Sequence, residues 1–473
     1  MKVNYTDTNG CDALSPAQFD LSVYPGTSVT TSPLNKSICS GDSTRIILAG
    51  SQPGTTFSWT ATSNSIFITG YSNGSGLYIN QKLINTGSNP DSVIYLVTPD
   101  YGGCLGLTVD YVVTVNPLLP VSITVSPSEN PVCEGTSVTF TASSTNGGTN
   151  PTYQWKVNGA NVGTNQQTYS YVPSNGDSVR CVLTSSEQCP SGNPASSNPV
   201  IMGVKDAPVV IFTPCFDTIT TTTAKPIKLK GGIPLGGTYT GPGVSNGYFY
   251  PGIAGSGTKT ITYTYVNSAL CSASAQSLIH SYTQTLLPCG EPMTDIRDGK
   301  TYPTVQIGTQ CWMAANLNFG TMIPGGMHQR DNCISEKYCF NDDPALCALH
   351  SALYQWVELM RYEESEGLQG LCPPGWHIPT EAEWNVLFSN WTNNAFAGAP
   401  LKYSGYSGFN ALLSGVNHLN RQWDFQDFAT FFWSSTAHGT NKAWAHGMND
   451  CDASVSAYSS YRNNAFSVRC VKD

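Results

Sequence analysis

Short runs in which apolar and polar residues alternate make up most of the chain before Pro288. Examples are "TFSWTAT", "VTFTAS" and "TKTITYTYV", which are separated by segments rich in Gly, Asn, Pro and Ser. A period of two is typical of strands with one buried face, and many short strands joined by turns indicate β-sandwiches. The pattern therefore predicts a mainly β protein built from tandem immunoglobulin-like or PKD-like β-sandwiches.

The hydrophobic pattern changes to helical spacing at two places after Met293. Asp343 followed by Pro344 is an N-cap and first-turn signal in front of "ALCALHSALYQWVELM". Thr380 and Glu383 form a capping box at the start of "EAEWNVLFSNW". Two helices among short strands predict an α+β domain at the C-terminus.

Three segments of the β-rich part share one layout, with one Cys before a strand and another Cys in the turn after a later strand. Such internal repetition indicates an array of similar domains. We expect the two cysteines of each segment to pair. The predicted disulfides are Cys39 with Cys104, Cys133 with Cys189, and Cys215 with Cys271.

The repeat register also decides how Cys181 is interpreted. A conventional immunoglobulin pattern would pair Cys133 with Cys181 around Trp155. The register instead matches Cys189 with the closing cysteines of the other repeats, so Cys181 is expected to be a buried thiol or to have an unusual partner. Trp155 and Trp59 are expected in the sandwich cores.

The N-terminal segment resembles the last two strands of one more repeat. "VNYTDTNGC" followed by "AQFDLSVYP" is similar to "ITYTYVNSALC" followed by "AQSLIHSY". We expect that Cys11 has lost its natural partner and that the chain is the C-terminal part of a longer protein. The alternative is that another subunit completes this half-repeat by strand addition, which would build a filament.

Composition narrows the class of protein. Charged residues make up 11% of the chain, against an average of about 25%, and the net charge is −9. An acidic chain lacks the basic face that nucleic acid requires. Sixteen cysteines indicate disulfides and an oxidising, extracellular compartment. No apolar run is long enough for a membrane span, and the first residues lack the apolar segment of a signal peptide.

Five motifs occur in order near the C-terminus: "TDIRDGKTYPTVQIGTQCWMAANLNFG", "LYQW", "LCPPGWHIPTEAEWNVL", "FFWSST" and "FSVRCVKD". This set resembles the Fibrobacter succinogenes major paralogous domain (FISUMP), whose members are extracellular or surface proteins. The resemblance implies a C-type-lectin-like fold, also used by formylglycine-generating enzyme, and no established activity. "GGTYTGPGVSNGYFYPGIAGSGTKTITYTY" is similar to the repeats of large secreted bacterial surface proteins.

These resemblances imply a domain organisation and the pairing of four of the last eight cysteines. The predicted domains are the half-repeat at 1–32, a PKD-like sandwich at 33–116, immunoglobulin-like sandwiches at 117–203 and 204–287, and the C-type-lectin-like domain at 288–473. The family pattern implies that Cys372 pairs with Cys470 and Cys339 with Cys347. Cys289 with Cys311 and Cys333 with Cys451 are the remaining predicted pairs.

Most tryptophans of the last domain lie inside the family motifs and are expected in its core, namely Trp312, Trp376, Trp384 and Trp433. The stretch from residue 443 to 466 is different, because aromatic rings there stand beside polar groups that can stack on a sugar and bond its hydroxyls. The alternative is an ordinary polar loop. The candidate ligand-binding residues are Trp444, Asn449, Asp450, Asp452, Tyr458, Tyr461, Arg462 and Asn463.

Metal and enzyme chemistry receive less support. Asn341, Asp342 and Asp343 carry oxygen ligands suited to Ca²⁺, although short acidic turns are more often capping groups and the Glu-Pro-Asn signature of sugar-binding C-type lectins is missing. The histidines lack a third ligand at zinc spacing. The cysteines are even in number and are expected to be paired, unlike the reactive thiols of formylglycine-generating enzyme. Ser407 in "GYSGF" lacks the context of a nucleophile elbow.

We therefore expect a non-enzymatic surface adhesin or recognition protein. Its stalk of sandwiches would display a lectin-like head that binds a glycan or a protein on another surface. The alternative function is a structural filament subunit, joined to copies of itself through the N-terminal half-repeat.

Overall fold

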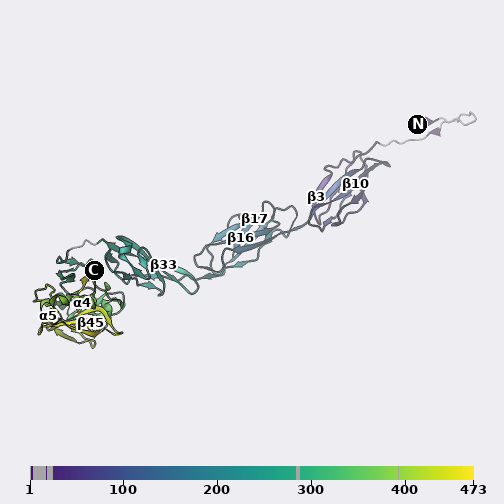
Figure 1. Cartoon of the computed structure of the whole chain (residues 1–473). Helices are drawn as coiled ribbons and strands as arrows, with labels where there is room; N and C mark the ends of the chain where they lie inside the picture. Colours follow the sequence, from purple (N-terminus) through teal and green to yellow (C-terminus); the bar gives the residue numbers. More distant parts are fainter. Residues whose placement is uncertain (1, 4–16, 19–24, 284–287, 393) are drawn as a thin grey trace, which may run out of the picture. The chain divides into compact units, whose positions relative to one another are not determined.

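The computed structural model describes residues 2–3, 17–18, 25–283, 288–392 and 394–473 (Figure 1). The chain divides into two compact units, Met1–Lys205 and Asp206–Asp473. Strands predominate in both units, as the alternating pattern predicts. Cys11 and most of the predicted half-repeat lie outside the described residues, where only β1 (Lys2–Val3) and β2 (Ala17–Gln18) are described, as an antiparallel pair.

A six-stranded sheet dominates the first sandwich of the N-terminal unit. Its strand order is β3-β12-β10-β5-β7, with β11 paired to β10. Alternate side chains of β5 and β10 face the core, where Trp59 and Tyr95 are buried, as predicted for Trp59. The strands are β3 (Asn35–Cys39), β4 (Ile46–Ile47), β5 (Thr56–Thr62), β6 (Ile68–Thr69), β7 (Gly74–Ser75), β8 (Tyr78–Ile79), β9 (Ile84–Asn85), β10 (Asp91–Tyr101), β11 (Cys104–Leu105) and β12 (Val109–Asn116).

The second sandwich has two main sheets, in the orders β14-β16-β19 and β18-β17-β20-β22, and β23 also pairs with β20. Their inward side chains share one core around Trp155, which is fully buried as predicted and donates its indole N–H to the carbonyl oxygen of Gln166 at 2.9 Å. The strands are β13 (Leu119–Pro120), β14 (Ser122–Pro127), β15 (Val132–Cys133), β16 (Val138–Thr145), β17 (Thr152–Val157), β18 (Ala160–Val162), β19 (Thr168–Tyr171), β20 (Ser178–Thr184), β21 (Pro190–Ser191), β22 (Ala195–Ser196), β23 (Val200–Ile201) and β24 (Val204–Lys205).

Cys39 bonds to Cys189 of the second sandwich, so the predicted pair with Cys104 is wrong. Cys39 lies opposite Asn116 at the end of β12, whereas Cys104 lies in the β10–β11 hairpin that precedes the start of β12. These ends of β12 are separated by about 20 Å at roughly 3.3 Å per residue. A disulfide needs Cα atoms within about 7 Å. The repeat layout fixes the order of the cysteines but not the end of the sandwich at which each one lies.

The same geometry rules out the predicted pair of Cys133 with Cys189. Strand β21, next to Cys189, pairs with β13, where the chain enters the second sandwich. Strand β15, which contains Cys133, pairs with β24, where the chain leaves it. Cys133 is also disulfide-bonded. In this unit a disulfide therefore joins one sandwich to the next.

Among the described cysteines of the N-terminal unit, Cys104 and Cys181 are free thiols. Cys181 is buried in the core of the second sandwich, one of the two outcomes that the repeat register indicates, and burial raises the pKa of its thiol to about 11. Cys104 is an exposed thiol. Cys104 lies at one end of the first sandwich, and the bonded Cys189 lies at the corresponding end of the second sandwich.

A third sandwich begins the C-terminal unit. Its largest sheet has the order β26-β33-β32-β29 and contains the long hairpin of β32 and β33. Phe249, Ile261 and Tyr263 are buried in its core. The elements are β25 (Ile211–Phe212), β26 (Ile219–Thr221), β27 (Ile227–Lys228), β28 (Gly232–Ile233), β29 (Thr238–Thr240), β30 (Val244–Ser245), β31 (Tyr248–Phe249), α1 (Pro251–Ala254), β32 (Gly257–Val266) and β33 (Ser272–Tyr282).

Cys215 bonds to Cys333 of the following domain, so the predicted pair with Cys271 is wrong. Ile219 lies beside His280 in the pairing of β26 with β33. Cys271 lies about 30 Å from His280 along the strand direction. The four residues from Ile219 to Cys215 span at most about 14 Å, which is too short to close that gap. Cys271 is also disulfide-bonded.

The last domain, which we call the head, combines a seven-stranded sheet, a four-stranded sheet and short helices. The seven-stranded order is β40-β47-β42-β44-β45-β46 with β43 paired to β42, and the four-stranded order is β36-β37-β48-β41. The strands are β34 (Met293–Thr294), β35 (Thr301–Tyr302), β36 (Thr304–Ile307), β37 (Gln310–Met313), β38 (Thr321–Met322), β39 (Glu336–Lys337), β40 (Tyr354–Gln355), β41 (Trp376–His377), β42 (Ser414–Asn417), β43 (Trp423–Gln426), β44 (Ala429–His438), β45 (Lys442–Asn449), β46 (Ser456–Tyr461), β47 (Ala465–Phe466) and β48 (Val471–Lys472).

Both predicted helix starts are present in the head. Asp343 caps α2 by accepting a hydrogen bond from the backbone N–H of Ala345, and Thr380 with Glu383 forms the capping box of α4. The first helix is shorter than predicted, because it ends at His350 and strand β40 separates it from α3. The helices are α2 (Pro344–His350), α3 (Trp356–Leu359), α4 (Glu381–Phe388) and α5 (Asn394–Leu401), with 3₁₀ turns at Phe340–Asp342 and Ser389–Trp391.

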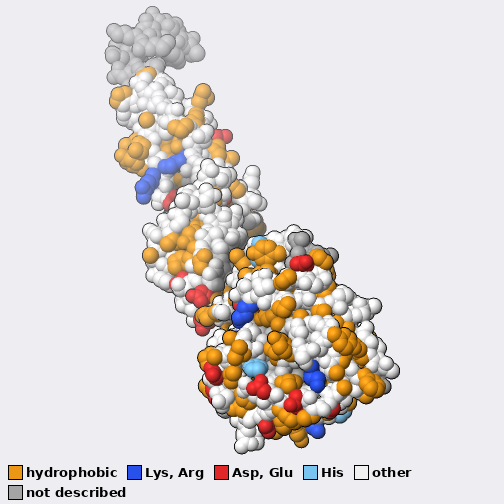
Figure 2. All heavy atoms as spheres, turned by 90° about the vertical axis from the view of Figure 1, so that its left-hand side faces the viewer, with side chains coloured by type: hydrophobic (Ala, Val, Ile, Leu, Met, Phe, Trp, Pro, Cys, Tyr) orange, Lys and Arg blue, Asp and Glu red, His pale blue; other side chains and the backbone are white. Residues whose placement is uncertain are grey.

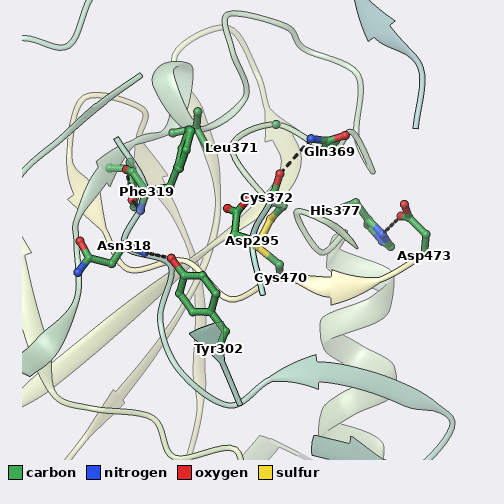
Figure 3. Close-up of a disulfide and its surroundings, with 12 residues drawn as sticks. Asp295, Tyr302, Asn318, Phe319, Gln369, Leu371, Cys372, His377, Cys470 and Asp473 are labelled. Atoms are coloured by element: carbon green, nitrogen blue, oxygen red, sulfur yellow. Dashed lines mark hydrogen bonds and ion pairs between the residues drawn. A yellow bond between two sulfur atoms is a disulfide. The ribbon is translucent and has the colours of Figure 1, made fainter. Parts of the chain in front are cut away.

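Three predicted disulfides of the head are confirmed, namely Cys372–Cys470, Cys339–Cys347 and Cys289–Cys311. Figure 3 shows the first of them beside His377 and Asp473. The pair of Cys333 with Cys451 is wrong, because Cys333 is bonded to the third sandwich. Cys451 is an exposed free thiol in the turn after β45.

The core of the head contains aromatic rings and the buried guanidinium group of Arg469. Trp312, Trp376, Trp384 and Trp433 are all buried, as predicted. Arg469 is fully buried, and its guanidinium group lies 4.5 Å from the ring of Phe409. This group donates hydrogen bonds to the backbone carbonyl oxygens of Met313, Phe409 and Asn410 and to the side-chain oxygen of Asn316.

Candidate functional site

Strands β44, β45 and β46 place several predicted residues on one side of the seven-stranded sheet. Lys442 lies opposite His438 on one neighbour and opposite Tyr461 on the other. Trp444 follows two positions along β45 and lies opposite Ser459. Directly opposed residues of an antiparallel pair point to the same face. We call these five residues, His438, Lys442, Trp444, Ser459 and Tyr461, the aromatic face.

The rings of the aromatic face are held by neighbouring side chains. His438 contacts Trp444 edge-on, with ring centroids 5.0 Å apart. The ammonium group of Lys442 lies 4.8 Å from the centre of the Tyr461 ring, a cation–π contact. Tyr461 remains 45% exposed. The face therefore presents an open aromatic ring beside hydrogen-bonding groups.

Helix α4 packs on the face of β45 that carries Lys442 and Trp444, at the next residue of that face, His446. His446 is buried there, with its Nε2 atom 2.9 Å from a carboxylate oxygen of Glu381 and its ring 5.1 Å from that of Trp384. His446 is thus part of the packing of α4 against the sheet. The aromatic face begins where this cover ends, at Trp444.

Two other predicted residues face the interior. Tyr458 lies opposite Ala445 and contacts the edge of the Phe431 ring, and its hydroxyl is buried. Arg462 is buried, with its guanidinium group 4.3 Å from the Trp356 ring. Both residues therefore support the head and do not belong to the aromatic face.

The polar residues Asn449, Asp450 and Asp452 lie at the opposite end of β45 from Lys442. Asn449 accepts hydrogen bonds from the backbone N–H groups of Cys451 and Asp452, and Asp452 accepts from Ser454. These bonds close a turn on itself. Asn463 is exposed near Tyr461, and its carbonyl oxygen accepts a hydrogen bond from the amide of Gln355. Trp444 and Tyr461 therefore lie on one face of the sheet, whereas the turn that contains Asp450 and Asp452 lies at the other end of β45.

The predicted calcium ligands have partners within the chain. Asp343 caps α2, and Asp342 accepts a hydrogen bond from the backbone N–H of Gly325 at 2.6 Å. Asn341 lies in the 3₁₀ turn before them. Within the described ranges, no cluster of three or more His, Cys, Asp or Glu side chains is arranged to hold a metal. Calcium binding stays a prediction.

A buried histidine near the chain end is bound between two carboxylates. His377 Nδ1 lies 2.6 Å from Asp473 and Nε2 lies 2.8 Å from Glu383, as Figure 3 shows for Asp473. Burial alone would lower the pKa of His377, but its hydrogen bonds to both carboxylates raise it to about 8. The cation links α4 to the terminal strand, which is a structural role.

A charged junction that the sequence did not predict joins the third sandwich to the head. Asp217 accepts hydrogen bonds from Arg297 at 3.0 Å and from Arg361 at 2.7 Å. Burial opposes ionisation of Asp217, but the two guanidinium groups hold its pKa below the usual value. Lys228 pairs with Glu363, and this junction also contains the Cys215–Cys333 disulfide. Only the charges in "TDIRDGK" could have indicated a buried arginine here.

Comparison with protein families identifies two parts of the chain. The family model of the Fibrobacter succinogenes major domain matches residues 305–472. The head is therefore similar to this domain over most of its length. A PKD-like domain matches residues 36–118, in the first sandwich. Both matches agree with the resemblances seen in the sequence motifs, whereas the C-type-lectin-like fold of the major domain stays a prediction.

Similar solved structures are tandem immunoglobulin-domain proteins and an adhesin. The eight N-terminal immunoglobulin domains of Down Syndrome Cell Adhesion Molecule share 12% identity over 60% of this chain, which spans 43% of that structure, with a TM-score of 0.25. A 1.5-MDa bacterial ice-binding adhesin shares 15% identity over 53% of this chain and 94% of that structure, with a TM-score of 0.28. The ectodomain of mouse nectin-like molecule 4 shares 12% identity over 54% of this chain and 99% of that structure, with a TM-score of 0.26. No curated protein matches the sequence.

The surface and the helices add two observations. The face of the head in Figure 2 shows hydrophobic side chains spread among a few charged ones. None of the helices in the described part of the chain combines the length and hydropathy of a membrane-spanning segment.

Proposed function

We propose that the protein is an extracellular surface adhesin whose head binds a glycan through the aromatic face. The observation that carries this proposal is the placement of Trp444 and Tyr461 on the same face of the adjacent strands β45 and β46 in the head, beside Lys442 and His438. Aromatic rings stack on the apolar face of a sugar, and neighbouring polar groups bond its hydroxyls. This combination fits recognition of a ligand without chemistry.

Disulfides between consecutive domains support a display role for the sandwiches. Cys39–Cys189 joins the first sandwich to the second, and Cys215–Cys333 joins the third to the head. Covalent links between domains limit the bending of a stalk and require an oxidising environment. The domain organisation that we propose is 33–116, 117–203, 204–287 and 288–473, preceded by the half-repeat at 1–32.

A glycan array tests the proposal. The full chain should bind a subset of immobilised glycans, and Trp444→Ala and Tyr461→Ala should each weaken that binding about tenfold, the loss expected for one stacked ring. Tyr406→Ala is the matched control, because Tyr406 is an 81% exposed aromatic residue of the head outside the aromatic face. Its binding should equal that of the wild type.

Two results would count against glycan recognition. An array without any bound glycan contradicts it, and so does binding that Trp444→Ala and Tyr461→Ala leave intact. Binding to a deglycosylated cell surface that still depends on Trp444 would indicate a protein ligand. The filament alternative stays a prediction, because most of residues 1–32 lie outside the described part of the chain.

A further inference from the structure

The aromatic face carries a cation, Lys442, for which the described residues supply no acidic partner. Its ammonium group lies 4.8 Å from the centre of the Tyr461 ring. In the described part of the chain, the lysines that form an ion pair with a carboxylate are Lys225, Lys228, Lys230 and Lys300. The charge of Lys442 is therefore available to a ligand.

Glutamates that reach the same three strands are bonded to other side chains. The bonded pairs are Glu364 with Arg462, Glu366 with Thr436, and Glu381 with His446, at 2.7, 2.7 and 2.9 Å. The acidic turn that contains Asp450 and Asp452 lies at the opposite end of β45. The five residues of the aromatic face therefore present a positive charge and no negative one.

The net charge of the chain acts in the opposite direction. It is −9, which would repel an anionic ligand at a distance. At physiological ionic strength, however, exposed charges more than about 8 Å apart are largely screened. Recognition at the aromatic face is therefore decided by the charges on that face, where the permanent charge is the ammonium group of Lys442.

The cation lies within reach of a ligand that stacks on Trp444. Lys442 and Trp444 are two positions apart on β45, so they point to the same side at a spacing of about 7 Å. His438 on β44 and Ser459 on β46 flank them and can donate hydrogen bonds. All four residues are at least partly exposed, so a ligand can reach them. Donors around an aromatic ring favour a ligand rich in acceptors.

We propose that the aromatic face recognises an acidic glycan, whose carboxylate or sulfate group is bound by Lys442 while a sugar ring stacks on Trp444. This inference rests on the proposed glycan recognition and adds the charge of the ligand to it. A lysine ammonium group acts as a point charge with three rotatable donors, so it accepts a planar carboxylate and a tetrahedral sulfate alike. The acidic substituent is the feature that the site selects.

Glycans that differ only in charge test this inference on the full chain. The array carries each acidic glycan beside its neutral counterpart, which is the methyl ester of each carboxylate sugar and the desulfated form of each sulfated sugar. The wild type should bind acidic members about fivefold more tightly, the upper end for an exposed ion pair. Lys442→Gln should abolish this preference, whereas Lys442→Arg should keep it. Added NaCl should weaken acidic binding by the wild type and leave Lys442→Gln unaffected.

Control variants separate the charge of the ligand from the stacking of its ring. Arg330→Gln removes an exposed cation of the head outside the aromatic face and should keep the preference. Trp444→Ala should weaken the binding of acidic and neutral glycans alike. Equal binding of both forms that depends on Trp444 would overturn the inference and leave glycan recognition intact, and so would a preference that survives in Lys442→Gln. An array without any bound glycan would contradict both proposals.

Discussion

Cys215 of the third sandwich is bonded to Cys333 of the head, which follows 118 positions later in the sequence. A link that closes so long a loop restricts the unfolded chain strongly, and the chain-entropy model gives about 4–5 kcal/mol of stabilisation. Removing both cysteines by Cys215→Ala and Cys333→Ala should therefore destabilise the C-terminal unit.

Tryptophan fluorescence during urea unfolding measures this effect, because eight of the ten tryptophans follow Pro288. The midpoint of the transition should fall clearly in the double variant. Cys451→Ala is the control, since it removes an exposed free thiol, and it should leave the midpoint unchanged. Equal midpoints for the wild type and the double variant would show that the disulfide does not stabilise the unit.

Asp217 is a carboxylate shared by Arg297 and Arg361, and Asp217→Asn should leave Arg361 without this counter-charge and Arg297 with Asp295 alone. The Arg297 side chain is only 4% exposed. Loss of one partner of a buried ion pair costs roughly 3–5 kcal/mol, whereas an exposed pair is worth at most about 1 kcal/mol. Asp298→Asn, which removes a more exposed partner of Lys300, should have little effect by the same urea assay.

The pH dependence of Asp217 follows from its lowered pKa. A carboxylate whose pKa is lower in the folded than in the unfolded state stabilises the fold above its usual pKa, and this contribution disappears as the pH falls. The wild-type unit should therefore lose stability below about pH 4. The stability of Asp217→Asn should change less over the same range.

Glu358 has the opposite behaviour. Burial raises the pKa of its carboxyl to about 7, while the N–H of Glu336 and the hydroxyl of Tyr362 donate to its oxygens. Because the folded-state pKa lies above the usual value, the protonated Glu358 carboxyl favours the folded state. This contribution to stability is fully present below about pH 4.5 and is lost as the pH rises through 7.

Glu358→Gln should therefore be more stable than the wild type at pH 8 and lose this advantage toward pH 4. The difference corresponds to roughly 3 kcal/mol at its largest. Urea unfolding at a series of pH values measures it, with exposed Glu291→Gln as the control. A difference that stays constant with pH would mean that Glu358 does not titrate in this range.

Arg469→Met should destabilise the head, because three backbone carbonyl oxygens and the Asn316 amide oxygen would lose their buried donor. Each unsatisfied buried group costs about 1–3 kcal/mol, so we expect a loss of at least about 3 kcal/mol in urea unfolding. Arg330→Met, at an exposed arginine of the head, should remain within about 0.5 kcal/mol of the wild type.

Local sequence patterns predicted the parts of this fold that local chemistry decides. Alternating residues gave the sandwiches, and the caps at Asp343 and Thr380 placed the starts of α2 and α4. The pairing of Cys372 with Cys470 came from the family motifs. The strands and the caps depend on residues within one segment, whereas this disulfide joins two motifs 98 residues apart and was predicted from the family pattern alone.

Long-range relationships were beyond the sequence. The repeat layout could not show that Cys39 and Cys104 lie at opposite ends of one sandwich, because that depends on how β3 and β12 pair. The side chains of β46 alternate between the two faces of the sheet. Of the two tyrosines predicted to bind a ligand, Tyr458 therefore faces the interior and Tyr461 faces outward. No local pattern marks Asp217 as the partner of two arginines 80 and 144 residues away.

Peptide mapping of the unreduced full chain tests the central claim, that disulfides join consecutive domains and so hold the head on its stalk. We predict linked peptides for Cys39–Cys189 and Cys215–Cys333, with Cys104 and Cys451 alkylated in the native protein. Peptides that link Cys39 to Cys104 and Cys215 to Cys271 would contradict it.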